Sequence, residues 1–358
     1  MTLPINLFEY EQRAKSHLSQ MAFDYYSSGA WDEVTLRDNR AAYECIKLLP
    51  RMLVDVSKRD LKVNILGESV QLPILIAPMA FQCLAHELGE VATAKAAASS
   101  GAGMILSTMS TKSIEEVAAS SNNSLRWFQL YIHKDKGLTR ALVERAFAAG
   151  YKALCLTVDA PLLGQRERDK RNEFVLPTGL NLANLTSMSS LDIPHEQGES
   201  GLFAYFAQQL NPAVTWRDLE WLQSLTTLPL VVKGILRADD AVNAVKCGAK
   251  AIIVSNHGGR QLDNAIASIE ALPDVVAAVD NQAEVLVDGG IRRGVDILKA
   301  IAYGANAVLI GRPILWGLAL NGEAGVAHVI QLLRAEFDLA MALSGCTCIK
   351  DIDSSLVC

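Results

Sequence analysis

Eight short apolar segments, separated by helical segments, constrain the fold of this chain more than any other feature. Each is continuously apolar rather than alternating, which is typical of parallel strands buried on both faces. In chain order they span 73–77, 103–107, 126–131, 153–158, 229–233, 251–255, 284–288 and 307–311. Alanine-rich stretches such as 90–100 and 238–247 lie between them and favour helices. This alternation predicts an α/β chain closed as a (β/α)8 TIM barrel, with an open doubly wound sheet as the alternative.

Two other segments precede or interrupt this repeat. Approximately residues 1–70 come before the first strand and include a helical stretch over 8–26. We therefore expect an N-terminal helical extension that flanks the barrel or closes its other mouth. After the fourth strand, residues of about 163–216 are rich in Ser, Asn, Leu and Gly and predict a long, mobile lid loop. With half of its 358 residues apolar, the chain can form one core, and we expect a single domain over 1–358.

Composition narrows the class of partner. The formal charge is −6 with acidic and basic residues interspersed, so we expect no nucleic-acid partner and no membrane partner. No run of eighteen apolar residues and no signal-peptide pattern is present. Seven scattered cysteines suit reduced thiols and a cytoplasmic location. Cys346 and Cys348 form a CxC without a neighbouring ligand pair, so we expect no metal.

The nine residues that begin at the end of the sixth apolar segment combine an acid–base group with an anion-binding group. They read Ser-Asn-His-Gly-Gly-Arg-Gln-Leu-Asp over 255–263. His257 can exchange a proton near neutral pH, and Arg260 can bind a carboxylate through two parallel hydrogen bonds. The two glycines between them allow a flat ligand to approach the backbone closely. This combination suits a small hydroxy acid, although a histidine taken alone would more often be structural.

Polar side chains recur at the ends of the other predicted strands. Because the carboxyl ends of barrel strands meet on one rim, their repetition favours a binding site over a set of isolated strand caps. The residues are Ser107, Gln129, Tyr131, Thr157, Asp159, Lys233, Ser255, His257, Asp288 and Arg312. Lys233 ends an apolar strand, where an ammonium group is costly unless it is paired or functional.

The loops after the last two strands predict a phosphate site, which is the usual position for one in this fold. The groups available there are the backbone N–H groups beside Gly289, Gly290 and Gly311 and the side chains of Arg292 and Arg312. Oxidation of a hydroxy acid releases two electrons that no side chain accepts, so a cofactor is required. No GxGxxG pattern follows an early strand, which disfavours a dinucleotide-binding module.

Residues 255–263 resemble the active-site signature of the FMN-dependent α-hydroxy-acid oxidases, a family that includes glycolate oxidases and L-lactate oxidases. The resemblance extends over nearly the whole chain, from 23–26 to 341–345. It implies FMN as the cofactor, a small 2-hydroxy acid and O2 as partners, and a homotetramer of barrels.

The resemblance also implies three groups of cofactor-binding residues. Those along the flavin edge near N5 are Ala77, Pro78, Met79 and Ala80. Those on the isoalloxazine ring or the ribityl chain are Ser107, Gln129, Thr157, Lys233, Ser255 and Asp288. Those at the phosphate end are Gly289, Gly290, Arg292, Gly311 and Arg312. Lys233 would lie by N1 and the C2 carbonyl, where its charge would stabilise the anionic reduced flavin.

On the substrate side, the resemblance places Tyr25, Arg166 and Arg260 around the carboxylate and Tyr131 on the α-oxygen. From the residues alone, Tyr25 could instead be a core residue of a helix. Arg166 lies in a run of charged residues that could equally be solvated.

The expected catalytic residues are His257, Asp159, Tyr131 and Lys233. By the same resemblance His257 would remove the hydroxyl proton as general base, and we favour departure of the α-hydrogen as hydride to N5. Asp159 would pair with His257 and stabilise its imidazolium. Its position before Ala-Pro also fits a simple turn residue.

Three residues differ from the plant glycolate oxidases that the chain resembles, and they bear on the substrate side chain. They are Met109 in place of tryptophan, Met79 in place of threonine and Phe206 in place of valine. Flexible, apolar methionine accommodates a methyl group. A buried methyl contributes about 0.8 kcal/mol, a several-fold preference, so we expect L-lactate over glycolate.

The expected reaction is therefore L-lactate to pyruvate, with O2 reduced to H2O2, because neither a haem-binding domain nor a membrane insert is evident. Three alternatives stay open at this point. They are a glycolate oxidase that forms glyoxylate, a soluble quinone-linked L-lactate dehydrogenase, and a protein of another class. The protein of another class could be a flavin-dependent isomerase, or it could be a non-redox barrel that binds a phosphorylated ligand.

Overall fold

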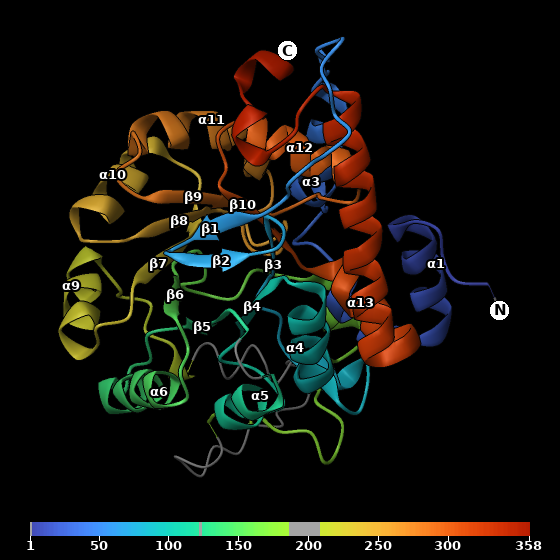
Figure 1. Ribbon diagram of the computed structural model, residues 1–358. Coiled ribbons are helices and arrows are strands. Elements are labelled where there is room, and N and C mark those ends of the chain that lie inside the picture. The colour runs from blue at the N-terminus through green and yellow to red at the C-terminus, as the bar shows by residue number, and fades with distance from the viewer. Residues whose placement is uncertain (1, 122–123, 186–207) are drawn as a thin grey trace.

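The computed structural model describes residues 2–121, 124–185 and 208–358, and at its centre is a closed barrel of eight parallel strands (Figure 1). The strands are β3 (Ile74–Ile76), β4 (Gly103–Leu106), β5 (Arg126–Leu130), β6 (Ala153–Thr157), β7 (Leu230–Ile235), β8 (Ala251–Val254), β9 (Glu284–Val287) and β10 (Ala307–Ile310). Each strand pairs with its neighbours in chain order, and β10 pairs with β3 to close the ring. The predicted (β/α)8 barrel is confirmed, and the open sheet is wrong.

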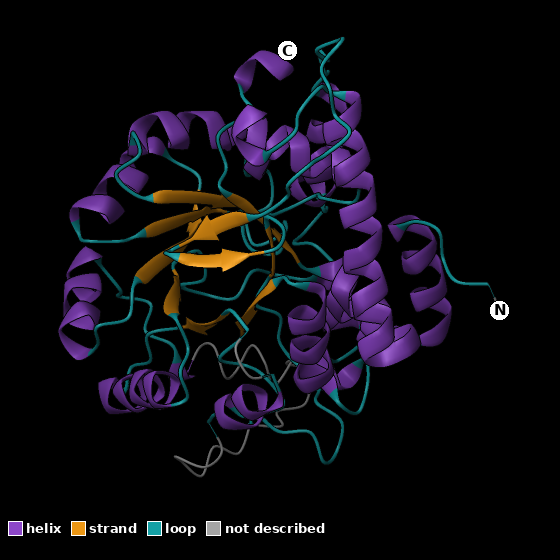
Figure 2. Ribbon diagram, viewed as in Figure 1, coloured by secondary structure: helices purple, strands orange, loops and turns teal. Residues whose placement is uncertain are grey.

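Helices surround the barrel as an outer layer (Figure 2). They are α4 (Gly89–Ser100), α5 (Ile114–Ser120), α6 (Lys136–Ala148), α9 (Trp216–Leu225), α10 (Ala238–Lys246), α11 (Ser268–Val279), α12 (Gly294–Ala302) and α13 (Arg312–Leu343). The run assigned to α13 is broken at Asn321 and Gly322, whose backbone angles are not helical. Short 3-10 turns occupy η1 (Gln82–Leu84), η2 (Ile349–Asp351) and η3 (Ser354–Leu356).

The strands are apolar on both faces because both faces are buried. One set of side chains fills the barrel interior, among them Leu75, Ile105, Trp127, Val231 and Leu309. The neighbouring positions, such as those of Ile74 and Ile76, face the helices and join the larger core. This two-sided burial explains why the sequence shows continuous apolar runs rather than alternation.

A hairpin that the sequence analysis did not predict lies across the end of the barrel where the strands begin (Figure 1). Its antiparallel strands are β1 (Val63–Ile65) and β2 (Glu68–Val70). Ile65 and Val70 belong to the same apolar cluster as the barrel interior. The backbone N–H of Leu66 donates to the Glu284 carboxylate at 2.8 Å. A hairpin and not a helix therefore closes this mouth, and of the two placements expected for the N-terminal helices the flanking one is found.

The predicted N-terminal helices are present as α1 (Leu7–His17), α2 (Gln20–Ser27) and α3 (Val34–Cys45). α1 flanks the barrel on the outside of α13, where the Tyr10 hydroxyl lies 2.7 Å from Nδ1 of His328 (Figure 1). α2 and α3 lie at the opposite end of the barrel from the hairpin. There, the side chain of Asn39 reaches the loop after β8 by bonding Asn256.

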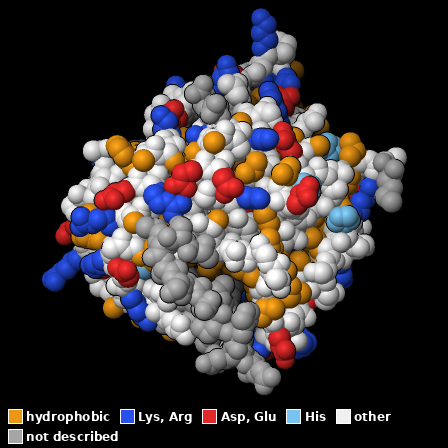
Figure 3. All heavy atoms as spheres, turned by 90° about the horizontal axis from the view of Figure 1, so that it is seen from below, with side chains coloured by type: hydrophobic (Ala, Val, Ile, Leu, Met, Phe, Trp, Pro, Cys, Tyr) orange, Lys and Arg blue, Asp and Glu red, His pale blue; other side chains and the backbone are white. Residues whose placement is uncertain are grey.

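The long segment predicted as a lid, 163–216, is described only in part. It contains α7 (Glu167–Arg171), and residues 186–207, including Phe206, lie outside the described residues. Over the described part of the chain, no helix has both the length and the apolar content needed to cross a membrane. On the face shown in Figure 3, basic and acidic side chains are intermixed.

Candidate active site

A pocket of about 1080 Å³, counting its open mouth, lies at the carboxyl ends of the barrel strands. Side chains from the ends of β3, β4, β5, β6, β7, β8, β9 and β10 or the loops after them line it, together with residues of α2. Among the described residues, every predicted site residue lines this pocket except Asp159 and Ser255. Asp159 and Ser255 lie directly behind the lining and bond residues in it. The structure thus brings together residues spread over most of the sequence.

His257 and Asp159 form a close pair at one side of the pocket. Nδ1 of His257 lies 2.7 Å from Oδ1 of Asp159. His257 has a left-handed backbone (φ 58°), and its backbone N–H bonds the Ser255 hydroxyl at 3.1 Å. Such conformations are strained for residues other than glycine and are concentrated at functional sites. The turn directs the imidazole from the end of β8 toward the carboxylate that follows β6.

The charges of this pair suit proton transfer from a substrate. Burial lowers the pKa of His257, although Asp159 opposes the shift. Burial alone would raise the pKa of Asp159, but His257 and Lys233 hold it below its ordinary value. An ionised carboxylate only accepts, so Nδ1 carries the hydrogen and Nε2 keeps a lone pair. His257 is therefore a neutral base at neutral pH.

Two guanidinium groups meet beside this base. Nη1 of Arg260 donates to the Ser28 carbonyl at 2.9 Å, and its guanidinium lies 5.1 Å from the centre of the Tyr25 ring. Nε of Arg166 reaches the Arg260 carbonyl at 3.4 Å. Burial, together with the charge of Arg260, lowers the pKa of Arg166 to about 10. Arg166 is buried and Arg260 is partly buried, and two neighbouring cations in this setting favour an anionic ligand between them.

These contacts decide between the two interpretations of Arg166 and Tyr25. Arg166 is 7% exposed, so the solvated charge run is wrong for this residue. Tyr25 is buried in α2 and stacks on Phe174, with ring centres 4.4 Å apart. It also lines the pocket, so it belongs both to the core and to the site.

Lys233 is a buried ammonium group held by polar partners. Its Nζ lies 2.8 Å from the Ser255 hydroxyl and 3.2 Å from the Asp288 carboxylate. Burial would lower the pKa of Lys233, but the carboxylates of Asp288 and Asp159 outweigh it and raise the value. Lys233 thus stays positively charged in the pocket wall.

Several buried polar atoms of the wall have no hydrogen-bond partner among the described residues. They are Nε2 of Gln129, Oγ1 of Thr157 and Oδ1 of Asp288. Buried polar groups are normally satisfied, so unpaired atoms facing one pocket indicate a polar ligand. A flavin ring edge offers both donors and acceptors, and a ribityl chain offers hydroxyls. The residues present therefore fit FMN.

The opposite end of the pocket has features of an anion site. Gly289 and Gly290 have positive φ angles of 95° and 80°, and Gly311 precedes the first turn of α13. The Arg312 guanidinium donates to the backbone carbonyls of Tyr26, Ser28 and Gly258 at 2.9–3.0 Å. Its side chain therefore links the end of α2 to the loop after β8, and its charge remains close to the pocket. Burial lowers the pKa of Arg312.

Sequence reasoning missed some of the lining. Tyr26, Gly258, Ile291, Leu309, Ile310 and Leu315 also line the pocket. Tyr26 follows Tyr25 in the same helix, and its hydroxyl bonds the Phe81 carbonyl at 2.7 Å. Ile310 ends β10, the position at which polar residues on other strands were singled out. Apolar residues at that position carried no signal that distinguished them from the core.

Comparison with known proteins decides the family. The family model described as FMN-dependent dehydrogenase matches residues 14–358. The chain belongs to this family. It is therefore an FMN-dependent oxidoreductase, and the predicted family and cofactor are confirmed.

Relatives of this family member cover almost its whole length. An L-lactate oxidase of Nostoc sp. strain PCC 7120 is 73% identical over 99% of this chain and 98% of its own. The human 2-hydroxyacid oxidase 1 is 52% identical over 98% of this chain and 95% of its own. A crystal structure of mandelate oxidase with (S)-4-hydroxymandelic acid has a TM-score of 0.94, at 42% identity over 99% of this chain and 98% of its own.

Proposed function

We propose that this protein oxidises L-lactate to pyruvate and reduces O2 to H2O2. The observation that carries the proposal is a neutral His257, held by the Asp159 carboxylate behind it, in the same pocket as the Arg166 and Arg260 guanidinium groups. A base and a carboxylate-binding pair that line one pocket suit a small 2-hydroxy acid. The 73% identity to a protein named L-lactate oxidase supports the same substrate.

FMN, when bound, accepts the two electrons released from the α-carbon and passes them to O2. The wall of the pocket supplies the contacts. Ala77, Pro78, Met79 and Ala80 would border the ring near N5, and Ser107, Gln129 and Thr157 would bond its polar edge. Lys233, oriented by Ser255, would place a positive charge by N1, and Asp288 would accept from ribityl hydroxyls. Gly289, Gly290, Arg292, Gly311 and Arg312 would hold the phosphate end.

The substrate is oriented by the side chains around the two arginines. Arg260 and Arg166 bind its carboxylate with Tyr25, and Tyr131 contacts its α-oxygen. Nε2 of His257 takes the hydroxyl proton, and Asp159 stabilises the resulting imidazolium.

The side-chain preference rests on Met79 and Met109. Both line the pocket, and Met109 is almost completely buried. Their flexible thioethers leave an apolar space that suits the methyl group of lactate. Glycolate, which lacks this methyl group, is the second candidate, since several relatives are named glycolate oxidases. Phe206, the third expected determinant, lies outside the described residues.

The assembly and location follow from the same proposal. We propose a homotetramer in the cytoplasm with O2 as its direct acceptor. All seven cysteines are free thiols, as is usual in a reducing compartment. An oxygen electrode, run with and without an artificial quinone acceptor, distinguishes the oxidase from the quinone-linked dehydrogenase.

Anaerobic titration tests the proposed reaction directly. The purified holoenzyme should show oxidised flavin absorption that L-lactate bleaches and air restores, with one H2O2 formed per turnover. The ratio of kcat/KM for L-lactate to that for glycolate should be several-fold above one. Flavin that no 2-hydroxy acid reduces would support the isomerase or phosphate-binding alternatives. A preference for glycolate would overturn the substrate assignment.

A further inference from the structure

The loop over 289–293, here called the phosphate loop, joins β9 to α12 and begins with two left-handed glycines. Glycine in such positions gives the free chain many conformations. A loop of this kind binds an anion tightly only if something else holds its amides in place, because ordering it on binding would oppose affinity. The contacts behind the loop, on the side away from the pocket, supply that restraint.

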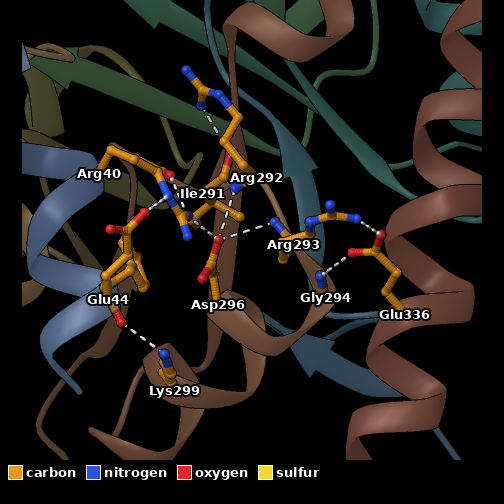
Figure 4. Close-up of polar contacts among 11 residues, drawn as sticks. Arg40, Glu44, Ile291, Arg292, Arg293, Gly294, Asp296, Lys299 and Glu336 are labelled. Atoms are coloured by element: carbon orange, nitrogen blue, oxygen red, sulfur yellow. Dashed lines mark hydrogen bonds and ion pairs between the residues drawn. The ribbon is translucent and has the colours of Figure 1, made fainter. Parts of the chain in front are cut away.

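Asp296, in the first turn of α12, is the centre of these contacts (Figure 4). Its carboxylate is fully buried, and Oδ2 accepts the backbone N–H groups of Arg292 and Arg293, each at 2.9 Å. Charge-assisted bonds of this type are stronger than neutral ones. Asp296 thus fixes the carboxyl-terminal half of the phosphate loop. The two N–H groups that it binds are no longer available to a ligand.

Arg40, on α3 of the N-terminal extension, completes the arrangement. Its Nη1 forms an ion pair with Oδ2 of Asp296 and also donates to the Gly290 carbonyl at 3.2 Å. The C=O and N–H of neighbouring residues in one planar trans peptide point in opposite directions. Holding the Gly290 carbonyl toward Arg40 therefore turns the N–H of Ile291 away from α3. Ile291 lines the pocket.

α3 is also in direct contact with this loop. A Cβ atom added to Gly290 would collide with the backbone carbonyl of Asn39, the residue before Arg40. Glycine is therefore required at 290 by close packing as well as by its positive φ. On the far side, the backbone N–H of Gly294 and the guanidinium of Arg293 bond Glu336 of α13 at 2.8 and 2.7 Å (Figure 4).

We propose that Arg40 and Asp296 are a positioning pair that holds the phosphate loop ready for the FMN phosphate, so that cofactor affinity depends on α3. Neither residue lines the pocket, and both act through the backbone of 290–293. Arg40 also balances the buried carboxylate, which would otherwise repel a phosphate dianion. The inference rests on the proposed cofactor site, and the following test separates the two.

The test compares FMN with riboflavin, which lacks the phosphate, on apoprotein stripped of its flavin. Arg40→Met and Asp296→Asn should each raise the Kd for FMN by roughly ten- to a hundredfold, as expected for loss of charge-assisted hydrogen bonds. The Kd for riboflavin, measured by the same quenching of flavin fluorescence, should stay unchanged. Arg40→Lys, which keeps the charge, should recover part of the FMN affinity and guards against misfolding of the methionine variant.

Arg59→Met is the matched control. Arg59 forms a two-bond pair with Asp338 of α13 at 2.8 and 2.6 Å, and neither residue lines the pocket. Its loss should leave the ratio of the two Kd values as in the parent protein.

Three outcomes would overturn the inference. An equal rise in the Kd for FMN and in the Kd for riboflavin would mean that Arg40 and Asp296 only support the fold. Tighter FMN binding by Asp296→Asn would mean that net charge alone matters. A parent protein that binds riboflavin as tightly as FMN would remove the proposed phosphate site itself, and the positioning role with it.

Discussion

At the residue scale, the Asp159 carboxylate determines how well His257 can hold a proton during the reaction. The two groups lie 2.7 Å apart, and burial keeps the pKa of His257 below its ordinary value of 6.5. The base is active when deprotonated, so kcat/KM for L-lactate should be level near neutral pH. It should fall about tenfold per unit only on the acid side of that lowered pKa.

Asp159→Asn tests this pair. The variant removes the charge that opposes the burial effect, so the acid limb of the pH profile should move to lower pH. The plateau of kcat/KM near neutral pH should drop by roughly 10²- to 10⁴-fold, because the imidazolium loses the carboxylate that stabilises it. Stopped-flow reduction of the flavin over a pH series measures both changes. An acid limb that moves upward would contradict the assignment, and His257→Gln should remove the limb altogether while the protein stays yellow.

The second prediction at this scale concerns carboxylate binding by Arg260. Arg260→Lys keeps the charge but loses the planar fork that binds two oxygens. It should raise the KM for L-lactate by roughly ten- to a hundredfold, the value of about one or two charged hydrogen bonds. The inhibition constant of acetate should rise in parallel. Arg168→Lys is the control, because Arg168 pairs with Glu33 at 2.6 Å and does not line the pocket.

Most of the site could be predicted from residues because its chemistry is concentrated at strand ends. Lys233 and Asp288 directly follow apolar residues and His257 comes three residues after Val254, so the fold places them on one rim. Arg40 and Asp296 could not be found in this way. Both lie within helices, where a charged residue ordinarily faces solvent, and only the packing of α3 on the phosphate loop brings them together.

At the scale of elements, the β1–β2 hairpin closes the barrel at the end remote from the pocket. Its strands have three residues each, too few to show a period that a sequence could reveal. The barrel strands are also short, but each recurs between helical segments, and that repetition made them predictable. The N-terminal extension was predicted as helical and proves to be mixed, because the hairpin's apolar residues complete the barrel interior.

Ile65→Ala should separate stability from activity. Ile65 is completely buried beneath the barrel, so truncation should lower the free energy of unfolding by roughly 2–5 kcal/mol. The rate of flavin reduction by L-lactate below the melting transition should remain that of the parent, because the hairpin lies at the other end of the barrel. Thermal unfolding measures the change in stability, and stopped-flow reduction measures the rate of flavin reduction. A large fall in reduction rate at full folding would show that the hairpin also shapes the pocket.

At the scale of the whole molecule, one projecting loop distinguishes the surface. Leu49, Met52, Leu53 and Val54 are all exposed, and the loop extends beyond the body of the protein (Figure 1). Leu53 has a left-handed backbone (φ 60°), a conformation that favours glycine. Contiguous exposed apolar residues mark contact surfaces between proteins. We propose that a second copy of this chain covers this loop in the proposed homotetramer.

The double substitution Met52→Ser with Leu53→Ser tests that assignment. In mass photometry the parent protein should appear as a tetramer, and the variant should shift to smaller species because the apolar contact is lost. Phe147→Ser, at an isolated exposed position on α6, is the control and should leave the mass unchanged. Flavin absorption should be equal in all three proteins, since the loop does not line the pocket. A variant that stays tetrameric would place the subunit contact elsewhere and leave the strained leucine at this tip without a partner.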